Sequence, residues 1–120
     1  MKYMLLIYDN ANTRETFRSA EGETLMAEVD ALMKELTESG ELVGGEALAD
    51  PSTTRTIRVV DGAPAITDGP FAEAKEHLGG YLIVDCESAE RAAEIALRWP
   101  SARVTPLEVR PLMDTAGAEM

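Results

Sequence analysis

The chain has 120 residues, of which 45% are hydrophobic and 28% charged, and its formal net charge at pH 7 is −11. This length predicts a single domain with a real hydrophobic core, and the composition is that of a soluble globular protein. Because binding to phosphates needs clustered Lys and Arg, the negative charge argues against nucleic acid and against an anionic membrane surface as partners. The apolar run at residues 1–8 is too short for a signal peptide or a membrane span.

The single cysteine, Cys86, cannot form an internal disulfide, which favours a reducing, cytoplasmic location. It lies in an apolar strand pattern, where a thiol is inert. One His and one Cys cannot supply the usual ligands of a zinc site in one chain. Glu73, Glu76 and His77 form a carboxylate–imidazole set that a metal ion could use, but we expect neither a metal nor a cofactor.

In chain order, the β-branched, aromatic and long apolar side chains at 3–8 predict a strand buried on both faces. Residues 9–20 are polar and predict a loop with a helical start. Apolar residues then recur at steps of three and four over 21–39 and predict a helix that Gly40 ends. A short, interrupted strand follows between residues 42 and 48.

The alternating, β-branched stretch 54–60 predicts a strand with one polar face, and Asp61-Gly62 is a strong hairpin signal. Residues 65–67 return from the hairpin, and 81–86 predict a further strand. Ser88 is the expected N-cap of a helix that ends at Trp99, and 106–110 predict the last strand. We expect one domain over residues 1–113 and a frayed tail over 114–120.

The order strand, helix, strand, hairpin, strand, helix, strand predicts an α+β sandwich of the ferredoxin-like kind. Its two helices would cover one face of an antiparallel sheet and leave the second face open. An apolar face of that size seldom stays exposed to water. We therefore predict a homodimer that pairs sheet face to sheet face and encloses a cavity.

The densest group of ionisable side chains lies between an Asp-Gly-Pro-Phe turn at 68–71 and the pair Gly79-Gly80. Asp68 either only caps the turn or presents a carboxylate at the edge of a cleft. Phe71 is expected to be a buried anchor of the turn. After the turn, an extended chain is favoured over a helical one, and Gly79-Gly80 predicts a bulge or a close backbone approach.

The candidate site residues lie in or near this segment. We predict that Asp68, Glu73 and His77 are catalytic and that substrate is bound by Arg58, Lys75, Glu76 and Arg110. A carboxylate enclosed by apolar walls has a raised pKa and can act as a general acid or base near neutrality. A cation beside it would hold it ionised or bind an anionic substrate group. Such a cluster fits proton abstraction or isomerisation of a small acidic molecule; the alternative is salt bridges on a solvated edge.

Taken together, these motifs resemble the DGPF-type branch of the YCII-related family. The resemblance rests on 68–71 with Glu73, Lys75-Glu76 and Gly79-Gly80-Tyr81, on 40–48, on Trp99-Pro100 and on 109–111. It implies a dimeric α+β barrel. The wider superfamily includes cofactor-free monooxygenases, lactone isomerases and haem-binding enzymes, and genes of this branch often lie beside genes for extracytoplasmic-function sigma factors.

The chain departs from the family pattern at one point. In YCII-type relatives, a His on the first helix and an Asp before the Pro at the end of the second helix form the proposed catalytic pair. The matching positions here are about Val29 and Trp99, and neither side chain can move a proton. Three function classes therefore stay open: a cofactor-free enzyme on a small molecule, a ligand-binding module without catalysis, and a regulatory protein partner, for instance of a sigma factor.

Overall fold

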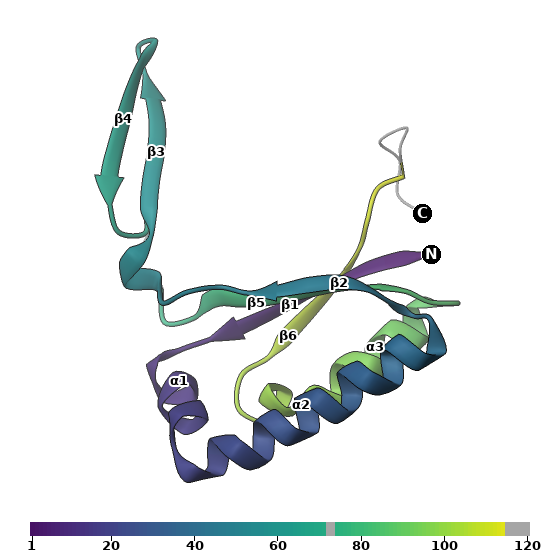
Figure 1. Cartoon of the computed structure of the whole chain (residues 1–120). Coiled ribbons are helices and arrows are strands. Elements are labelled where there is room, and N and C mark those ends of the chain that lie inside the picture. The colour runs from purple at the N-terminus through teal and green to yellow at the C-terminus, as the bar shows by residue number, and fades with distance from the viewer. Residues whose placement is uncertain (72–73, 115–120) are drawn as a thin grey trace.

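The computed structural model describes residues 1–71 and 74–114. Its main sheet is antiparallel, with the strand order β2-β5-β1-β6, and consists of β1 (Lys2–Asp9), β2 (Leu42–Ala47), β5 (His77–Asp85) and β6 (Leu107–Pro111). The helices α1 (Ala11–Arg18), α2 (Ala20–Ser39) and α3 (Ala89–Arg98) lie on one side of this sheet (Figure 1). The protein is therefore of the α+β class, and its topology is compatible with the predicted ferredoxin-like fold.

The hydrophobic core lies between the sheet and the helices α2 and α3. Alternate side chains of β1 and β5 point into it, and small residues on α3 let that helix approach the sheet closely. The opposite face of β1 carries Met4 and Leu6, which are only partly buried, so the expectation of a strand buried on both faces was wrong for the single subunit. The core residues are Tyr3, Leu5, Leu32, Leu36, Leu82, Val84, Cys86, Ala92, Ile95 and Ala96.

The predicted helix ends are confirmed. Gly40 follows α2 with a left-handed backbone (φ 79°), a conformation that an L side chain disfavours. The Ser88 side chain accepts a hydrogen bond of 3.1 Å from the Arg91 backbone N–H and so caps α3. After α3, the chain continues into a short 3₁₀ turn, η2 (Pro100–Arg103), before it reaches β6.

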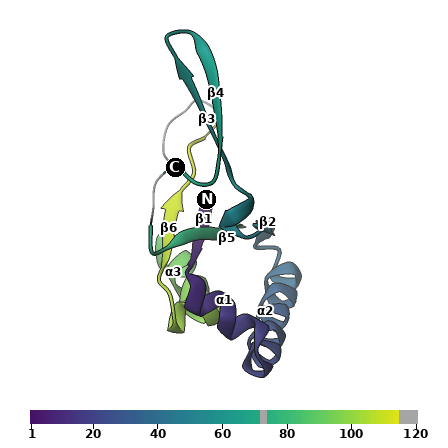
Figure 2. The ribbon, with the colours of Figure 1, turned by 90° about the vertical axis from the view of Figure 1, so that its left-hand side faces the viewer.

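The predicted hairpin forms a sheet of its own. Strands β3 (Arg55–Val60) and β4 (Ala63–Asp68) pair only with each other among the described strands, after a 3₁₀ turn, η1 (Pro51–Thr53). The hairpin projects away from the body of the molecule (Figures 1 and 2). Ile57 lies opposite Ile66, and Val59 opposite Pro64, so one face of the hairpin is apolar beyond the charged pair of Arg55 and Asp68 at its base. That face is solvent-exposed: Ile57 and Ile66 are 70% and 63% accessible.

Three local predictions were wrong. The segment before α2 contains the helix α1, because the Asn10 side chain accepts a hydrogen bond of 2.8 Å from the Thr13 N–H and caps it. Phe71 is 76% exposed rather than buried, and the Arg58 guanidinium lies 6.0 Å from the centre of its ring. The extended chain predicted after the turn was wrong for Lys75 and Glu76, which form bends, and correct from His77, where β5 begins.

Two predictions fall on residues that the structure does not describe. The predicted catalytic residue Glu73 and residues 115–120 of the predicted tail lie outside the described ranges. Within those ranges, none of the helices has the length and apolar character needed to cross a membrane.

Candidate functional site

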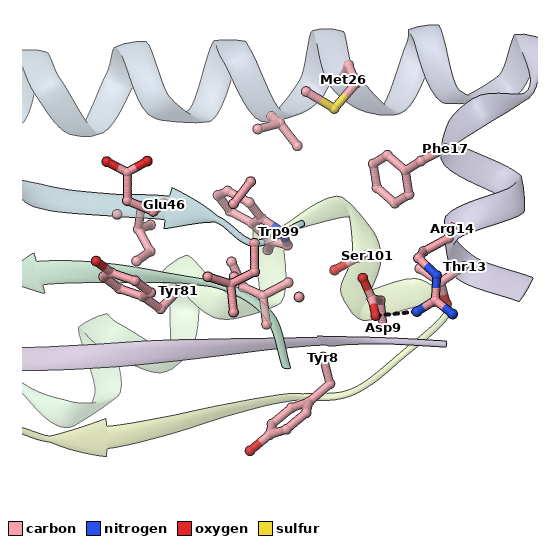
Figure 3. A pocket seen from close by; sticks show the side chains of 18 of the residues that line it. Tyr8, Asp9, Thr13, Arg14, Phe17, Met26, Glu46, Tyr81, Trp99 and Ser101 are labelled. Carbon is pink, nitrogen blue, oxygen red and sulfur yellow. Dashed lines mark hydrogen bonds and ion pairs between the residues drawn. The ribbon is translucent and has the colours of Figure 1, made fainter. Parts of the chain in front are cut away.

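A cavity of about 420 Å³ lies between the sheet and the helices, at the end where β1 and β5 approach α1 (Figure 3). This volume falls within the range of small-molecule pockets, which are typically apolar with a few placed polar groups. The apolar wall comes from β1, β5, α1 and α2, from the residue after β2 and from the residue after α3. It consists of Ile7, Phe17, Met26, Val29, Met33, Leu48, Leu82 and Trp99.

An ion pair forms the polar end of this cavity. Asp9 is the last residue of β1, and Asn10 turns the chain at once into α1, so Arg14 on the first turns of that helix faces back toward Asp9. Arg14 Nη1 donates to Asp9 Oδ1 at 2.8 Å, and both side chains are mostly buried (Figure 3). Arg14 Nε lies 3.5 Å from Asp50 Oδ2. The guanidinium thus holds the Asp9 carboxylate in place from one side.

Asp50 stays ionised beside that arginine for a local reason. Its carboxylate accepts a hydrogen bond of 3.0 Å from the Ser52 N–H, and this contact lowers the pKa of Asp50 below its ordinary value. Arg18 lies 3.8 Å from the same carboxylate. Two carboxylates and two guanidinium groups therefore alternate along this edge, and their formal charges balance.

The predicted bulge at Gly79-Gly80 is confirmed and adjoins this ion pair. Ile7 lies opposite Gly80 and Tyr8 opposite Leu78, so Gly79 is the extra residue in β5. A Cβ atom at Gly79 would lie 2.5 Å from Asp9 Oδ2, and one at Gly80 would lie 2.8 Å from the Glu46 carbonyl oxygen. The absence of side chains at these two positions lets the Asp9 carboxylate and the β2 backbone approach β5.

Buried hydroxyl groups gather at the same end of the molecule. Thr13 Oγ1 lies 3.0 Å from Asn10 Oδ1 and 2.5 Å from Thr105 Oγ1, so these two buried threonines satisfy each other. Ser101, in η2, is 3% exposed and also lines the cavity. Among the described residues, its Oγ is the one buried side-chain polar atom without a hydrogen-bond partner.

Tyr8 lies beside this end of the cavity, but its hydroxyl group is not inside the cavity. Its side chain points away from the cavity in Figure 3. The Tyr8 hydroxyl donates to Glu108 Oε1 at 2.6 Å on the open face of the sheet, and that bond raises the pKa of Tyr8. At this end of the cavity, the polar side chains that line it without being paired to each other as the threonines are include those of Asp9, Arg14 and Ser101; Glu46 also lines the cavity and is solvent-exposed.

None of the described site residues predicted from the central motif lines this cavity, although His77 is the cross-strand partner of Asp9. Asp68 ends β4 with its side chain 97% exposed, 3.9 Å from Arg55, while Arg58 stands on the neighbouring strand β3. His77 begins β5 and is partly buried beside a second, open pocket that Thr54 and Pro70 also line.

The remaining predicted residues are also spread over the surface. Lys75 is exposed, Glu76 accepts a hydrogen bond of 3.3 Å from Asn10 Nδ2, and Arg110 is exposed on β6. The described part of one subunit does not bring Asp68, His77 and Arg110 together.

Asp9, Arg14 and Ser101 were missed as site residues. Asp9 could have been found, because it is the first charged residue after a buried strand and stands directly before a capping residue. Ser101 has no such signal: it follows Trp99-Pro100 in a stretch whose burial depends on tertiary contacts alone.

The fold and the cavity define a small α+β protein with a cavity of about 420 Å³ between its sheet and its helices. Residues 1–116 match the YCII-related domain. The chain belongs to the YCII-related family. It is 32% identical over 114 residues to an uncharacterised protein, R00369, of Rhizobium meliloti (strain 1021). The matched residues make up 93% of this chain and 92% of that protein.

Proposed function

We propose that this protein binds a mainly apolar small molecule in the cavity and moves a proton on it with Asp9, without a cofactor. The observation that carries this proposal is the position of the Asp9 carboxylate, which lines a cavity of about 420 Å³ and is held by Arg14 at 2.8 Å. A general base must be fixed within reach of the proton that it takes. Arg14 occupies Asp9 Oδ1, so Oδ2 is the oxygen available for the proton.

The family pattern supports the same cavity. Val29 and Trp99 stand at the positions where relatives carry their proposed catalytic pair, and both line this cavity. This cavity lies on the helix-covered side of the sheet, whereas the sequence predicted one between the open faces of two sheets, and its acid–base group comes from another part of the chain. Asp9 is a carboxylate on the wall of that same cavity and can take over the proton transfer.

The test uses 2-tetralone, a bicyclic ketone with acidic hydrogens beside its carbonyl group. In deuterated buffer, Asp9 would take a proton from that carbon while the electron pair moves to the carbonyl oxygen, and a deuteron would return from the exchanged carboxyl group. We expect the wild-type protein to accelerate deuterium uptake, measured by NMR, and Asp9→Asn to abolish the acceleration. Asp61→Asn, at the hairpin tip, makes the same charge change far from the cavity and serves as the control. Equal rates for wild type and Asp9→Asn would refute the proposal.

The same measurement separates the alternative function. Binding of 2-tetralone without any acceleration of exchange would favour a non-catalytic ligand-binding module or regulator, such as one associated with an extracytoplasmic-function sigma factor.

Residues 68–71 remain the argument for the DGPF-type branch, and the unpaired Cys86 remains the argument for a cytoplasmic protein.

We also propose a homodimer that pairs the open faces of two sheets as a dimeric α+β barrel. In its support, Met4 and Leu6 of β1 lie opposite Ile83 and Tyr81 of β5 on the face that the helices do not cover, and all four are only partly buried. Such a dimer would enclose the exposed side of β6, with Arg110.

The central-motif residues keep their proposed roles in that second chamber. There, Asp68, Glu73 and His77 are the catalytic candidates, and Arg58, Lys75, Glu76 and Arg110 the substrate-binding ones. Asp68→Asn distinguishes the two sites: loss of exchange in this variant, with Asp9→Asn active, would move the chemistry to the dimer chamber.

A further inference from the structure

We infer that Ser101 donates a hydrogen bond to a carbonyl oxygen of the ligand, and that the ligand is an uncharged, mainly apolar carbonyl compound. This inference rests on the proposed use of the cavity and adds the class of molecule that it takes. The observation behind it is an unpartnered hydroxyl group on the wall: Ser101 is 3% exposed, lines the cavity, and its Oγ has no hydrogen-bond partner in the described part of the chain.

The backbone around Ser101 is fixed, so the hydroxyl cannot move far to find a protein partner. The Ser101 carbonyl oxygen accepts hydrogen bonds from the Val104 and Thr105 N–H groups at 2.9 and 2.8 Å. Pro100, before it, is buried and restricts the backbone further. A buried hydroxyl without a partner is costly, and nearly all such groups in folded proteins find one. A ligand in the cavity would supply the missing partner.

Two neighbouring buried hydroxyl groups, unlike that of Ser101, have hydrogen-bond partners within the chain. Thr13 and Thr105 are as deeply buried as Ser101, but they bond to each other at 2.5 Å and Thr13 also bonds to Asn10. The chain therefore satisfies two of the three buried hydroxyls internally. The third faces the cavity, beside the end where Asp9 and Arg14 lie (Figure 3).

The charges around the cavity exclude an anionic ligand. Arg14 is the one cation among its described lining residues, and two carboxylates already engage it, Asp9 at 2.8 Å and Asp50 at 3.5 Å. Glu46 adds a further acid to the lining. A ligand carboxylate or phosphate would find no unpaired cation there, so the polar group that enters must be neutral.

A ligand with a carbonyl group would engage both Asp9 and Ser101 in one reaction. A serine hydroxyl can donate to an oxygen atom, whereas a carboxylate can only accept or take a proton. When Asp9 takes a proton from the carbon beside the carbonyl group, negative charge develops on the carbonyl oxygen. Ser101 O–H is then the group that stabilises this charge, as donors in an oxyanion hole do.

The test compares 2-tetralone with tetralin, its hydrocarbon counterpart of similar shape, in wild type and Ser101→Ala. We expect Ser101→Ala to weaken the binding of 2-tetralone, relative to that of tetralin, by about 3- to 10-fold. NMR titration gives both dissociation constants, and this change in their ratio corresponds to the loss of one hydrogen bond. Tetralin should bind both proteins equally, because it makes no polar contact.

A second measurement checks the premise about the hydroxyl itself. Because Ser101→Ala removes an unsatisfied group, the ligand-free variant should melt at the same temperature as wild type or higher. A lower melting temperature would mean that ordered water satisfies Ser101 in the free protein, and it would overturn the inference. An unchanged ratio of dissociation constants, with tetralin bound, would overturn it as well and leave the Asp9 proposal standing. If neither probe binds, the inference fails together with the proposed function.

Discussion

Asp9 and Gly79 share one small space: a Cβ atom at position 79 would lie 2.5 Å from Asp9 Oδ2 and 2.9 Å from Asp9 Cγ. Real Cβ atoms do not approach other atoms so closely, so the carboxylate reaches the cavity wall only because residue 79 has no side chain. The bulge in β5 at this residue is the local backbone feature that makes the contact. The glycine pair of the central motif and the first acid after β1 thus belong to the same site.

Gly79→Ala is therefore expected to displace the Asp9 side chain and weaken its ion pair with Arg14. We expect the free energy of unfolding to fall by about 1 kcal/mol, because the Asp9 side chain can move aside but loses its ion pair, and the acceleration of 2-tetralone exchange to be lost. Urea denaturation and the NMR exchange assay measure these two effects.

Two variants control that prediction. Gly44→Ala lies in the neighbouring strand β2, where an added Cβ meets nothing within 4 Å, and should change the stability by no more than about 0.5 kcal/mol. In an Asp9→Ala background, Gly79→Ala should be less destabilising than in wild type, because the atom that it strikes is gone. Strictly additive losses would contradict the contact.

The fold was largely predictable because its signals are local. Gly40 and Ser88 mark helix ends by backbone and capping preferences, and Asp61-Gly62 marks a hairpin whose Asp61 and Gly62 both have positive φ (49° and 78°). Only a helical start was predicted where helix α1 lies, because its cap, Asn10, precedes a segment with a single large apolar residue, Phe17. Hydrophobic periodicity gives no signal there.

The site was harder to predict because it depends on contacts between distant segments. A dense group of charges drew attention to Asp68 and its neighbours, but that residue ends a projecting hairpin. The cavity is formed by segments that meet only in the folded chain, such as β1, η2 and the bulge in β5. Ser101 becomes distinctive only when its burial and its missing partner are known.

The ion pair between Glu41 and Arg91 predicts how stability depends on pH. Arg91 Nε and Nη2 donate to the two oxygens of Glu41 at 2.8 Å each, and these bonds lower the pKa of Glu41 from 4.5 to about 2. Since the pKa is lower in the folded state, the pair stabilises the protein fully above about pH 4.5, and this contribution is lost as the pH falls toward 2. We expect Glu41→Gln to lower the free energy of unfolding by about 1 kcal/mol at pH 7.

The difference between Glu41→Gln and wild type should shrink as the pH falls from 5 to 3, when urea denaturation is measured at each pH. Glu87→Gln makes the same change at an exposed position with no ion pair in the described part of the structure, and should show no such trend. A constant difference for Glu41→Gln at all pH values would rule out the ion pair as its cause.

Cys86 is predicted to react slowly with thiol reagents. It is buried in the core beside β5, and burial raises the pKa of its thiol, so little thiolate is present at neutral pH. Labelling with iodoacetamide at pH 7.5 should be slow in buffer and faster by at least tenfold in 8 M urea, as followed by mass spectrometry. Fast labelling of the native protein would show that this part of the core opens readily.

The proposed dimer is tested most directly on the open face of the sheet. Ile83 lies on that face, opposite Met4, and is only partly buried in the single subunit. Arginine at this position would place a charge in the interface of two apolar faces, so Ile83→Arg should convert a dimer into a monomer. Light scattering at micromolar concentration measures the mass, and Leu97→Arg, on the exposed side of α3, is the matched control that should stay dimeric.

The hairpin gives the same dimer a second test. A two-stranded hairpin is marginally stable in water on its own, and the exposed apolar face with Ile57 and Ile66 is the surface that a partner subunit would cover. Ile57→Ser combined with Ile66→Ser should therefore raise the dimer dissociation constant at least tenfold and leave the thermal stability of the monomeric Ile83→Arg protein unchanged. A loss of stability in that monomeric background would mean that the hairpin packs on its own subunit, and a monomeric wild type would remove the dimer altogether.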